Sequence, residues 1–291
     1  MACDNELRIY AADAQQAQAA ANKAIAEVKR IETTYSRYRD DSIISHINNA
    51  AGKQAVAVDT ETNVLLDIAD ASFRDSSGLF DITSGVLRRI WDFKIGIPPG
   101  KKQMESVLPL IGWDKVERDG EHIRLPLAGM EIDFGGIGKE YAADRAADIL
   151  RTEGITNGLV NLGGDISILG PHFGGALWDI HVAHPRKPGA IIATFRLGNG
   201  ALTTSGDYLR YFDFGGVRYC HILNPRTGWP VSYWQSATVI APQCSQAGQA
   251  SSVAMLLENG AEPYLERHGL GFLLVDAGGK LHRSTENRMA K

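Results

Sequence analysis

The sequence has little of what stabilises small secreted or zinc-bound proteins. Its 291 residues include three cysteines, Cys3, Cys220 and Cys244, which are too few and too scattered for a disulfide framework or a zinc site, so we expect reduced thiols. No apolar run approaches the length of a membrane span, and the N-terminus lacks a basic region followed by an apolar one. The sequence as written therefore predicts a soluble cytoplasmic protein, or a mature form whose leader has been removed, which would be periplasmic or membrane-anchored.

The chain also lacks a concentrated block of positive charge. Thirty lysines and arginines face 34 acidic residues, which gives a net charge of −4, and the basic side chains are dispersed. Binding to nucleic acid through electrostatic attraction is therefore disfavoured. A hydrophobic content of 44% with 22% charged residues is ordinary for a globular protein, and the length suits one large domain or two intimately packed halves.

The hydrophobic periodicity predicts helices and antiparallel strands in alternation, which is typical of the α+β class. Helical spacing follows a capping box at Asp13 and Gln16 and recurs at 60–77, 139–150 and 246–257. Strands are predicted at 6–11, 158–161, 166–169, 179–182, 190–197 and 236–240, and hairpins at 210–224 and 271–283.

Residues 131–145, EIDFGGIGKEYAADR, form the most informative stretch. An apolar strand start at 132–134 leads through Gly135-Gly136 and Gly138 into a helix that begins near Lys139. Glycine lets the backbone approach a ligand closely, and the free N–H groups at a helix start attract phosphate. The stretch therefore predicts a phosphate-bearing ligand, although a plain strand–turn–helix connection also uses glycine.

Five further motifs combine polar residues with glycine between the predicted strands. They are SRYRDDS (36–42), GLFDITSG (78–85), NLGGD (161–165), TTSGDY (203–208) and HILNPRTG (221–228). Each alone is ordinary turn chemistry. Because loops concentrate function, five of them on one scaffold indicate a composite site.

In this order the motifs resemble those of the FAD:protein FMN transferase family, also called the ApbE family, from about residue 6 to about residue 275. The family patterns are S-R-F/Y-R-x-D-S, G-x-F-D-x-T-x-G, D-L-G-G-I-A-K-G-Y-A-x-D, N-x-G-G-D, T-S-G-x-Y and H-I-I-D-P-x-T-G, followed by a helix with A-D-A-x-x-T. The resemblance implies one domain over residues 1–291, built from two tandem T-fold-like halves of antiparallel sheet plus helices. The ligand site would lie between the halves.

The resemblance also implies a reaction. The FMN half of FAD is transferred to a serine or threonine hydroxyl of an acceptor flavoprotein, AMP is released, and magnesium bridges the pyrophosphate. Some members instead hydrolyse FAD to FMN and AMP. Catalysis of such a phosphoryl-type transfer consists mainly of positioning and charge stabilisation.

The resemblance assigns cofactor-binding roles along the chain. The flavin would stack on Tyr38, and the adenosine side would contact Leu79, Phe80 and Asp81. The phosphates and ribose would contact Gly135, Gly138, Lys139 and Tyr141. Leu223 would contact the cofactor through its backbone. Three of these residues have plainer alternatives: Tyr38 as a core tyrosine, Asp81 as a helix N-cap, and Lys139 as a solvated helix residue.

His221 matches the family histidine that activates the acceptor hydroxyl. A neutral imidazole near its reference pKa is a suitable general base at pH 7, whereas the plainer alternative is a strand-end histidine bonded to the backbone. The carbonyl of Gly138 and the hydroxyl of Ser252 would be metal ligands, and Ser205 and Tyr208 would support the residues that touch the ligand.

Three departures from the family pattern bear on activity. Gly248 stands where the family has the metal-binding aspartate, so we expect weakened magnesium binding, which needs a carboxylate anchor. Asn224 replaces an aspartate and keeps its turn-forming geometry without the charge. Glu140 replaces a glycine; its carboxylate could compensate for the missing one, but its place on a helix favours a solvated glutamate. The alternative to a transferase is therefore an FAD-binding protein without catalysis, or an FAD pyrophosphatase.

Overall fold

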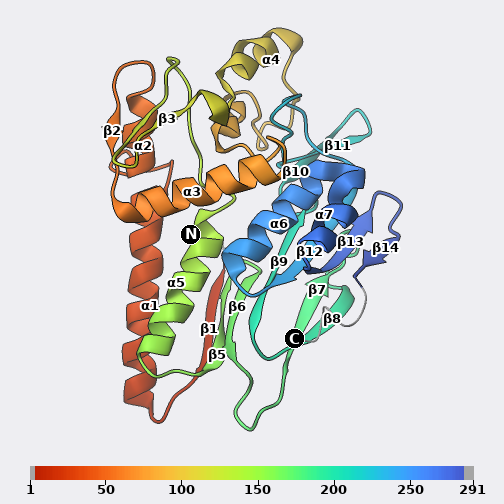
Figure 1. The fold of residues 1–291 in the computed structure, drawn as a ribbon. Coiled ribbons are helices and arrows are strands. Elements are labelled where there is room, and N and C mark those ends of the chain that lie inside the picture. The colour runs from red at the N-terminus through yellow and green to blue at the C-terminus, as the bar shows by residue number, and fades with distance from the viewer. Residues whose placement is uncertain (1–3, 285–291) are drawn as a thin grey trace.

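The computed structural model describes residues 4–284, and Cys3 lies outside them. A seven-stranded antiparallel sheet, in the order β1-β5-β6-β9-β12-β13-β14, forms its middle layer (Figure 1). The strands are β1 (Asn5–Tyr10), β5 (Asn157–Leu162), β6 (Asp165–Gly170), β9 (Gly200–Gly206), β12 (Trp234–Ala241), β13 (Gly271–Asp276) and β14 (Leu281–Arg283). Because β6 pairs with β9, the early and late strands of the chain join in one continuous sheet.

Helices cover one face of this sheet. They are α1 (Ala14–Tyr35), α5 (Gly138–Thr152), α6 (Cys244–Leu257), the short 3₁₀ helix η4 (Glu258–Gly260) and α7 (Ala261–Arg267). Four of the six buried residues of α5 are alanines, the others being Glu140 and Leu150, and α5 packs between α1 and α6. Such small side chains let neighbouring backbones approach closely, which sets α5 and α6 side by side beneath the candidate site (Figure 1).

The opposite face of the sheet is covered by the hairpin of β7 (Trp178–Ala183) and β8 (Ile191–Leu197). Along β7 the burial alternates strictly, as a strand with one apolar face requires. Its buried side chains pack against Ile168 of β6, Ile240 of β12 and Leu273 of β13 in a second hydrophobic cluster. The interior strand β12 is therefore buried on both faces throughout its length.

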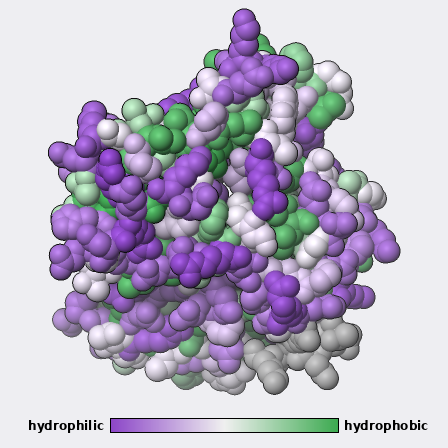
Figure 2. Space-filling model, turned by 45° about the horizontal axis from the view of Figure 1, so that its top comes forward, coloured by the Kyte–Doolittle hydropathy of each residue, from purple (hydrophilic) through white to green (hydrophobic). Residues whose placement is uncertain are grey.

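A second group of elements, called the cap below, lies over one end of the helices and sheet (Figure 1). Its elements are α2 (Ile43–Asn49), α3 (Thr60–Asp75), α4 (Lys101–Val107), η1 (Ile82–Arg89), η2 (Leu108–Leu110), η3 (Trp113–Lys115), the sheet β2 (Val56–Ala57), β4 (His122–Arg124), β3 (Glu117–Arg118), and the hairpin β10 (Tyr211–Phe214), β11 (Val217–Cys220). Figure 2 shows apolar residues reaching this end of the molecule in patches among hydrophilic ones.

The structure confirms the α+β class and the antiparallel strands. Some local predictions were wrong. Residues 132–134 form no strand, the expected loop at 203–208 begins inside the central strand β9, and the hairpin expected over 210–224 has strands only within 211–220. The periodicity also missed α2, α4 and α7, because helices of seven residues show too few turns for a pattern.

Within residues 4–284, no helix is both long and apolar enough to cross a bilayer. Cys220 and Cys244 are free and buried.

Candidate functional site

The glycine-rich stretch ends at the start of α5, and this helix start differs from those of α1, α2 and α3. Those helices begin with side-chain caps from Asp13, Ser42 and Asp59. The N-cap of α5 is Ile137, which offers no side-chain acceptor. The N–H of Gly138 donates to the carbonyl of Phe134 at 2.8 Å, so this helix start offers an anion the positive end of the α5 dipole rather than a full set of free N–H groups.

The two glycines before α5 each have close side-chain neighbours. A Cβ on Gly135 would lie 3.3 Å from the Asp133 carboxylate and 3.4 Å from the Arg88 guanidinium. A Cβ on Gly136 would lie 3.3 Å from the ring of Phe80. The glycine loop therefore passes between a charged cluster and an aromatic side chain.

The charged cluster connects the glycine loop to Tyr38. The Tyr38 ring is 78% exposed, which excludes a core tyrosine, and its hydroxyl accepts a hydrogen bond of 3.2 Å from Arg88. Arg88 also pairs with Asp133 at 3.1 Å, and the other oxygen of Asp133 accepts the N–H of Gly135 at 2.9 Å. Arg37 joins the same carboxylate at 3.3 Å. An exposed, flat ring is thus linked to the glycine loop through Arg88 and Asp133.

His221 lies close enough to this cluster for the charge of Arg88 to lower its pKa. Its Nδ1 is 3.3 Å from the carbonyl oxygen of Arg210. Because a carbonyl only accepts, Nδ1 carries the proton and the lone pair is on Nε2. Burial, and then repulsion from Arg210 and Arg88, lower the pKa of His221 to about 4. The imidazole is neutral at pH 7, as expected, but the expectation of a pKa near its reference value was wrong.

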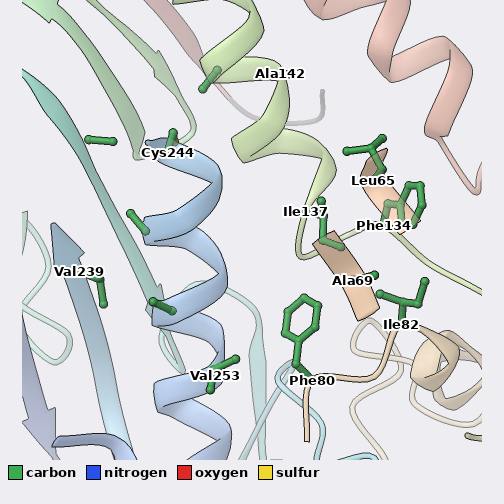
Figure 3. Close-up of a cluster of buried hydrophobic side chains, with 14 of the residues drawn as sticks. Leu65, Ala69, Phe80, Ile82, Phe134, Ile137, Ala142, Val239, Cys244 and Val253 are labelled. Atoms are coloured by element: carbon green, nitrogen blue, oxygen red, sulfur yellow. The ribbon is translucent and has the colours of Figure 1, made fainter. Parts of the chain in front are cut away.

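On the other side of the loop, Asp81 acts as the N-cap of η1. Its carboxylate accepts the N–H of Thr83 at 2.7 Å and the N–H of Trp113 at 3.1 Å, and its burial raises its pKa. The neighbouring Phe80 is buried between α6 and the segment that carries Ile137 (Figure 3), and the preceding residue, Leu79, is half-buried against the same core.

A pocket of about 520 Å³ opens beside Asp81. It is lined by residues that include Phe73, Gly78, Asp81, Gly112, Asp114 and Arg226. The Arg226 side chain donates to the carbonyl of Ser77, which joins the loop at 221–228 to the loop at 78–85. Two motifs that are far apart in the sequence therefore form one wall.

The turn after His221 keeps its geometry despite the departure at Asn224. The Asn224 side-chain oxygen accepts the N–H of Arg226 at 2.9 Å, as predicted for an asparagine in this turn. Leu223 pairs with Pro230 in an isolated bridge, which fixes its backbone.

Lys139 and Tyr141, on the first turn of α5, have their polar ends engaged. Lys139 forms an ion pair with the buried Asp165 of the NLGGD motif, so it is not a freely solvated residue. The Tyr141 hydroxyl donates to Glu61 of α3 at 2.9 Å, and burial together with this carboxylate raises its pKa to about 12. These contacts fix α5 to the sheet and to the cap.

Gly248 on α6 faces Glu140 on α5. A Cβ on Gly248 would lie 2.3 Å from Cγ of Glu140. The expectation of a solvated glutamate was wrong, because Glu140 is 7% exposed and its burial raises its pKa. One turn further along α6, the hydroxyl of Ser252 lies 3.3 Å from that of Ser205 on β9.

Sequence reasoning missed Arg88, Asp133 and Arg210. The aspartate of the D-F-G-G run was an available signal for Asp133, whereas the two arginines stand outside the motifs and only the fold brings them to the site.

The fold and the site together define a class of protein. It is an α+β protein in which a glycine loop before a helix start without a side-chain cap is linked through Arg88 to an exposed aromatic ring and packs on Phe80, which precedes the pocket residue Asp81. The model of the ApbE family matches residues 1–274, and the chain belongs to this family.

Two relatives and two solved structures illustrate the similarity. The FAD:protein FMN transferase of Klebsiella pneumoniae is 32% identical over 243 residues, which cover 81% of this chain and 73% of the relative. That of Vibrio cholerae is 28% identical over 255 residues, covering 85% and 76%. The ApbE protein of Thermotoga maritima superposes with a TM-score of 0.87 at 30% identity, covering 99% and 100% of the two chains. The flavin transferase ApbE from Vibrio cholerae gives 0.86 at 25% identity, covering 98% and 94%.

Proposed function

We propose that this protein is an FAD:protein FMN transferase that moves FMN from FAD to a serine or threonine hydroxyl of an acceptor flavoprotein and releases AMP. The observation that carries the proposal is the position of His221. His221, with its lone pair on Nε2, lies within electrostatic range of Arg88, and Arg88 also contacts the exposed Tyr38 and the Asp133 carboxylate at the glycine loop. A base beside a phosphate site and a stacking ring is what flavinylation of a hydroxyl requires.

In this proposal each part of FAD has its own contacts, which the geometry supports. The flavin stacks on Tyr38, the diphosphate lies on the backbone from Gly135 to the first turn of α5, and the adenosine lies toward Phe80 and the pocket beside Asp81. The ion pair with Asp165 holds Lys139 in place at the start of α5, where its positive charge favours the diphosphate.

His221 then acts as the general base in the transfer step. The acceptor oxygen attacks the phosphorus of the FMN half and forms a new P–O bond, and the anhydride P–O bond to AMP breaks. The hydroxyl proton moves to Nε2 of His221, while Nδ1 remains bonded to the Arg210 carbonyl and keeps the ring in position. AMP leaves with the electron pair of the broken bond.

Magnesium, when bound, would neutralise charge on the diphosphate. The residues present fit such an ion: the carbonyl of Gly138 and the hydroxyl of Ser252 are oxygen donors, and the buried Oε2 atom of Glu140 has no hydrogen-bond partner among residues 4–284.

The direct test incubates the protein with FAD, Mg²⁺ and a flavoprotein acceptor. Transfer gives one AMP for each flavin that remains attached to the acceptor on a denaturing gel. FMN and AMP without attached flavin would instead identify a pyrophosphatase, and retention of intact FAD would identify a binding protein.

Tyr38→Ala is expected to weaken FAD binding by about tenfold or more, because stacking on an aromatic ring contributes about 1–3 kcal/mol. Tyr38→Phe keeps the ring, loses only the bond from Arg88, and should stay within about threefold of the wild type. Fluorescence titration of FAD measures both. Equal affinities for all three proteins would show that the flavin does not stack on Tyr38.

The pH dependence of transfer should reflect the lowered pKa of His221. The neutral imidazole is the active form, so transfer is lost when the ring gains a proton. With a pKa of about 4, the rate should stay level from pH 8 down to about pH 5. A histidine with the ordinary pKa of about 6.5 would instead halve the rate near that pH. Initial rates measured across this range, with circular dichroism to verify folding, test the prediction. A half-maximal rate near pH 6.5 in folded protein would contradict it.

A further inference from the structure

We propose that Glu140 of α5 supplies the metal-binding carboxylate that Gly248 of α6 cannot supply. This inference rests on the proposed function, because it concerns the magnesium that would accompany FAD. Compared with the family pattern, a glycine on α5 has become Glu140 while an aspartate on α6 has become Gly248. We interpret the two departures as one exchange across the interface between these helices.

The contact between the two positions supports an exchange. The Cγ atom of Glu140 lies 2.3 Å from the point where a residue at 248 would place its Cβ, and its carboxyl carbon lies 3.0 Å from the same point. The carboxyl carbon of an aspartate at 248 would lie one bond from that Cβ. Glu140 therefore brings its carboxylate to the region that an aspartate on α6 would occupy, and the two side chains cannot both fit there.

The bonding of Glu140 indicates that a partner is missing. Glu140 is only 7% exposed, yet its Oε2 atom has no hydrogen-bond partner within residues 4–284. An unsatisfied carboxylate oxygen in a protein interior is unfavourable, and an apolar side chain would fill the same space without that penalty. A cation at Oε2 would satisfy this oxygen.

No protein group takes this role among the described residues around Glu140. Lys139, whose positive charge acts on Glu140, is already paired with Asp165. The carboxylate of Asp144, on the next turn of α5, is engaged by the N–H groups of Cys244 and Ser245, both at 2.8 Å. Glu140 thus has one unsatisfied carboxylate oxygen on the first turn of α5, two residues from the Gly138 carbonyl and packed against the helix that carries Ser252.

The test measures metal binding separately from transfer. Electron paramagnetic resonance of free Mn²⁺ gives the affinity of the protein for Mn²⁺ in the presence of FAD. Glu140→Gln preserves the shape of the side chain and removes its charge. Because loss of even an outer partner of a metal ligand costs about 10–100-fold in affinity, this variant should lose at least about tenfold. The control Asp148→Asn removes an exposed carboxylate from the same helix and should match the wild type.

The outcomes separate this inference from the proposed function. Equal Mn²⁺ affinities of the wild type and Glu140→Gln in the presence of FAD would show that Glu140 only fills space, and the inference would be wrong. The same holds if the FAD complex of the wild type binds no Mn²⁺. Failure of the wild type to bind FAD at all would overturn the proposed function, and the inference with it. Melting curves of Glu140→Gln without metal show whether a loss of affinity comes from unfolding.

Discussion

Replacing His221 with asparagine is expected to lower the rate of FMN transfer by about 10²- to 10⁴-fold, the range over which a general base contributes. The asparagine amide can still donate to the carbonyl of Arg210, so the local backbone should keep its conformation. It cannot accept the proton of the acceptor hydroxyl. Because this help is realised in the transition state, the dissociation constant of FAD should change by less than about threefold.

Single-turnover transfer with saturating FAD measures the chemical step, and fluorescence titration measures FAD binding. His181→Asn is a matched control, since His181 lies on the far hairpin, where it contacts Thr194 of β8. A His221 variant that loses FAD affinity but retains its turnover would show that the histidine binds the cofactor and does not move the proton.

The sequence predicts the elements of the sheet and of the helices that cover it, because these carry clear periodicity or capping signals. The capping box at Asp13 begins α1, and the glycine-rich run leads into α5. The sequence does not predict β9 correctly, since its threonine, serine and glycine residues resemble a loop. Strand pairing on both sides, with β6 and β12, makes this polar segment a central strand.

The same distinction applies to the candidate site. Motifs identify Tyr38, the glycine loop and His221, because each has a local signature. The sequence cannot predict that Arg88 connects the first two, nor that Arg88 and Arg210 lower the pKa of the third, since these effects depend on distances in the fold.

The relation between Glu140 and Gly248 is the clearest case of information absent from local patterns. Read separately, one residue is a solvated glutamate and the other a lost ligand. Contact across the α5–α6 interface makes them interdependent, because the volume missing from one side chain is filled by the other.

This packing predicts the effect of Gly248→Asp. A Cβ at 248 would overlap Cγ of Glu140 at 2.3 Å, and a second carboxylate would enter the same buried space. Overpacking of a well-packed core typically costs about 1–3 kcal/mol of stability, and repulsion between like charges adds to it. We therefore expect a lower melting temperature for this variant and no gain in affinity for magnesium, even though it restores the residue of the family pattern.

The double variant Glu140→Gly/Gly248→Asp should recover most of the lost stability, because each change makes room for the other. The free energy of coupling in the double-mutant cycle, obtained from urea unfolding of the four proteins without metal, should be at least about 1 kcal/mol. Gln246→Asp is the control, since it adds a carboxylate at an exposed position of the same helix. If Gly248→Asp is as stable as the wild type, or if the two changes are additive, then the two positions are independent and the packing argument fails.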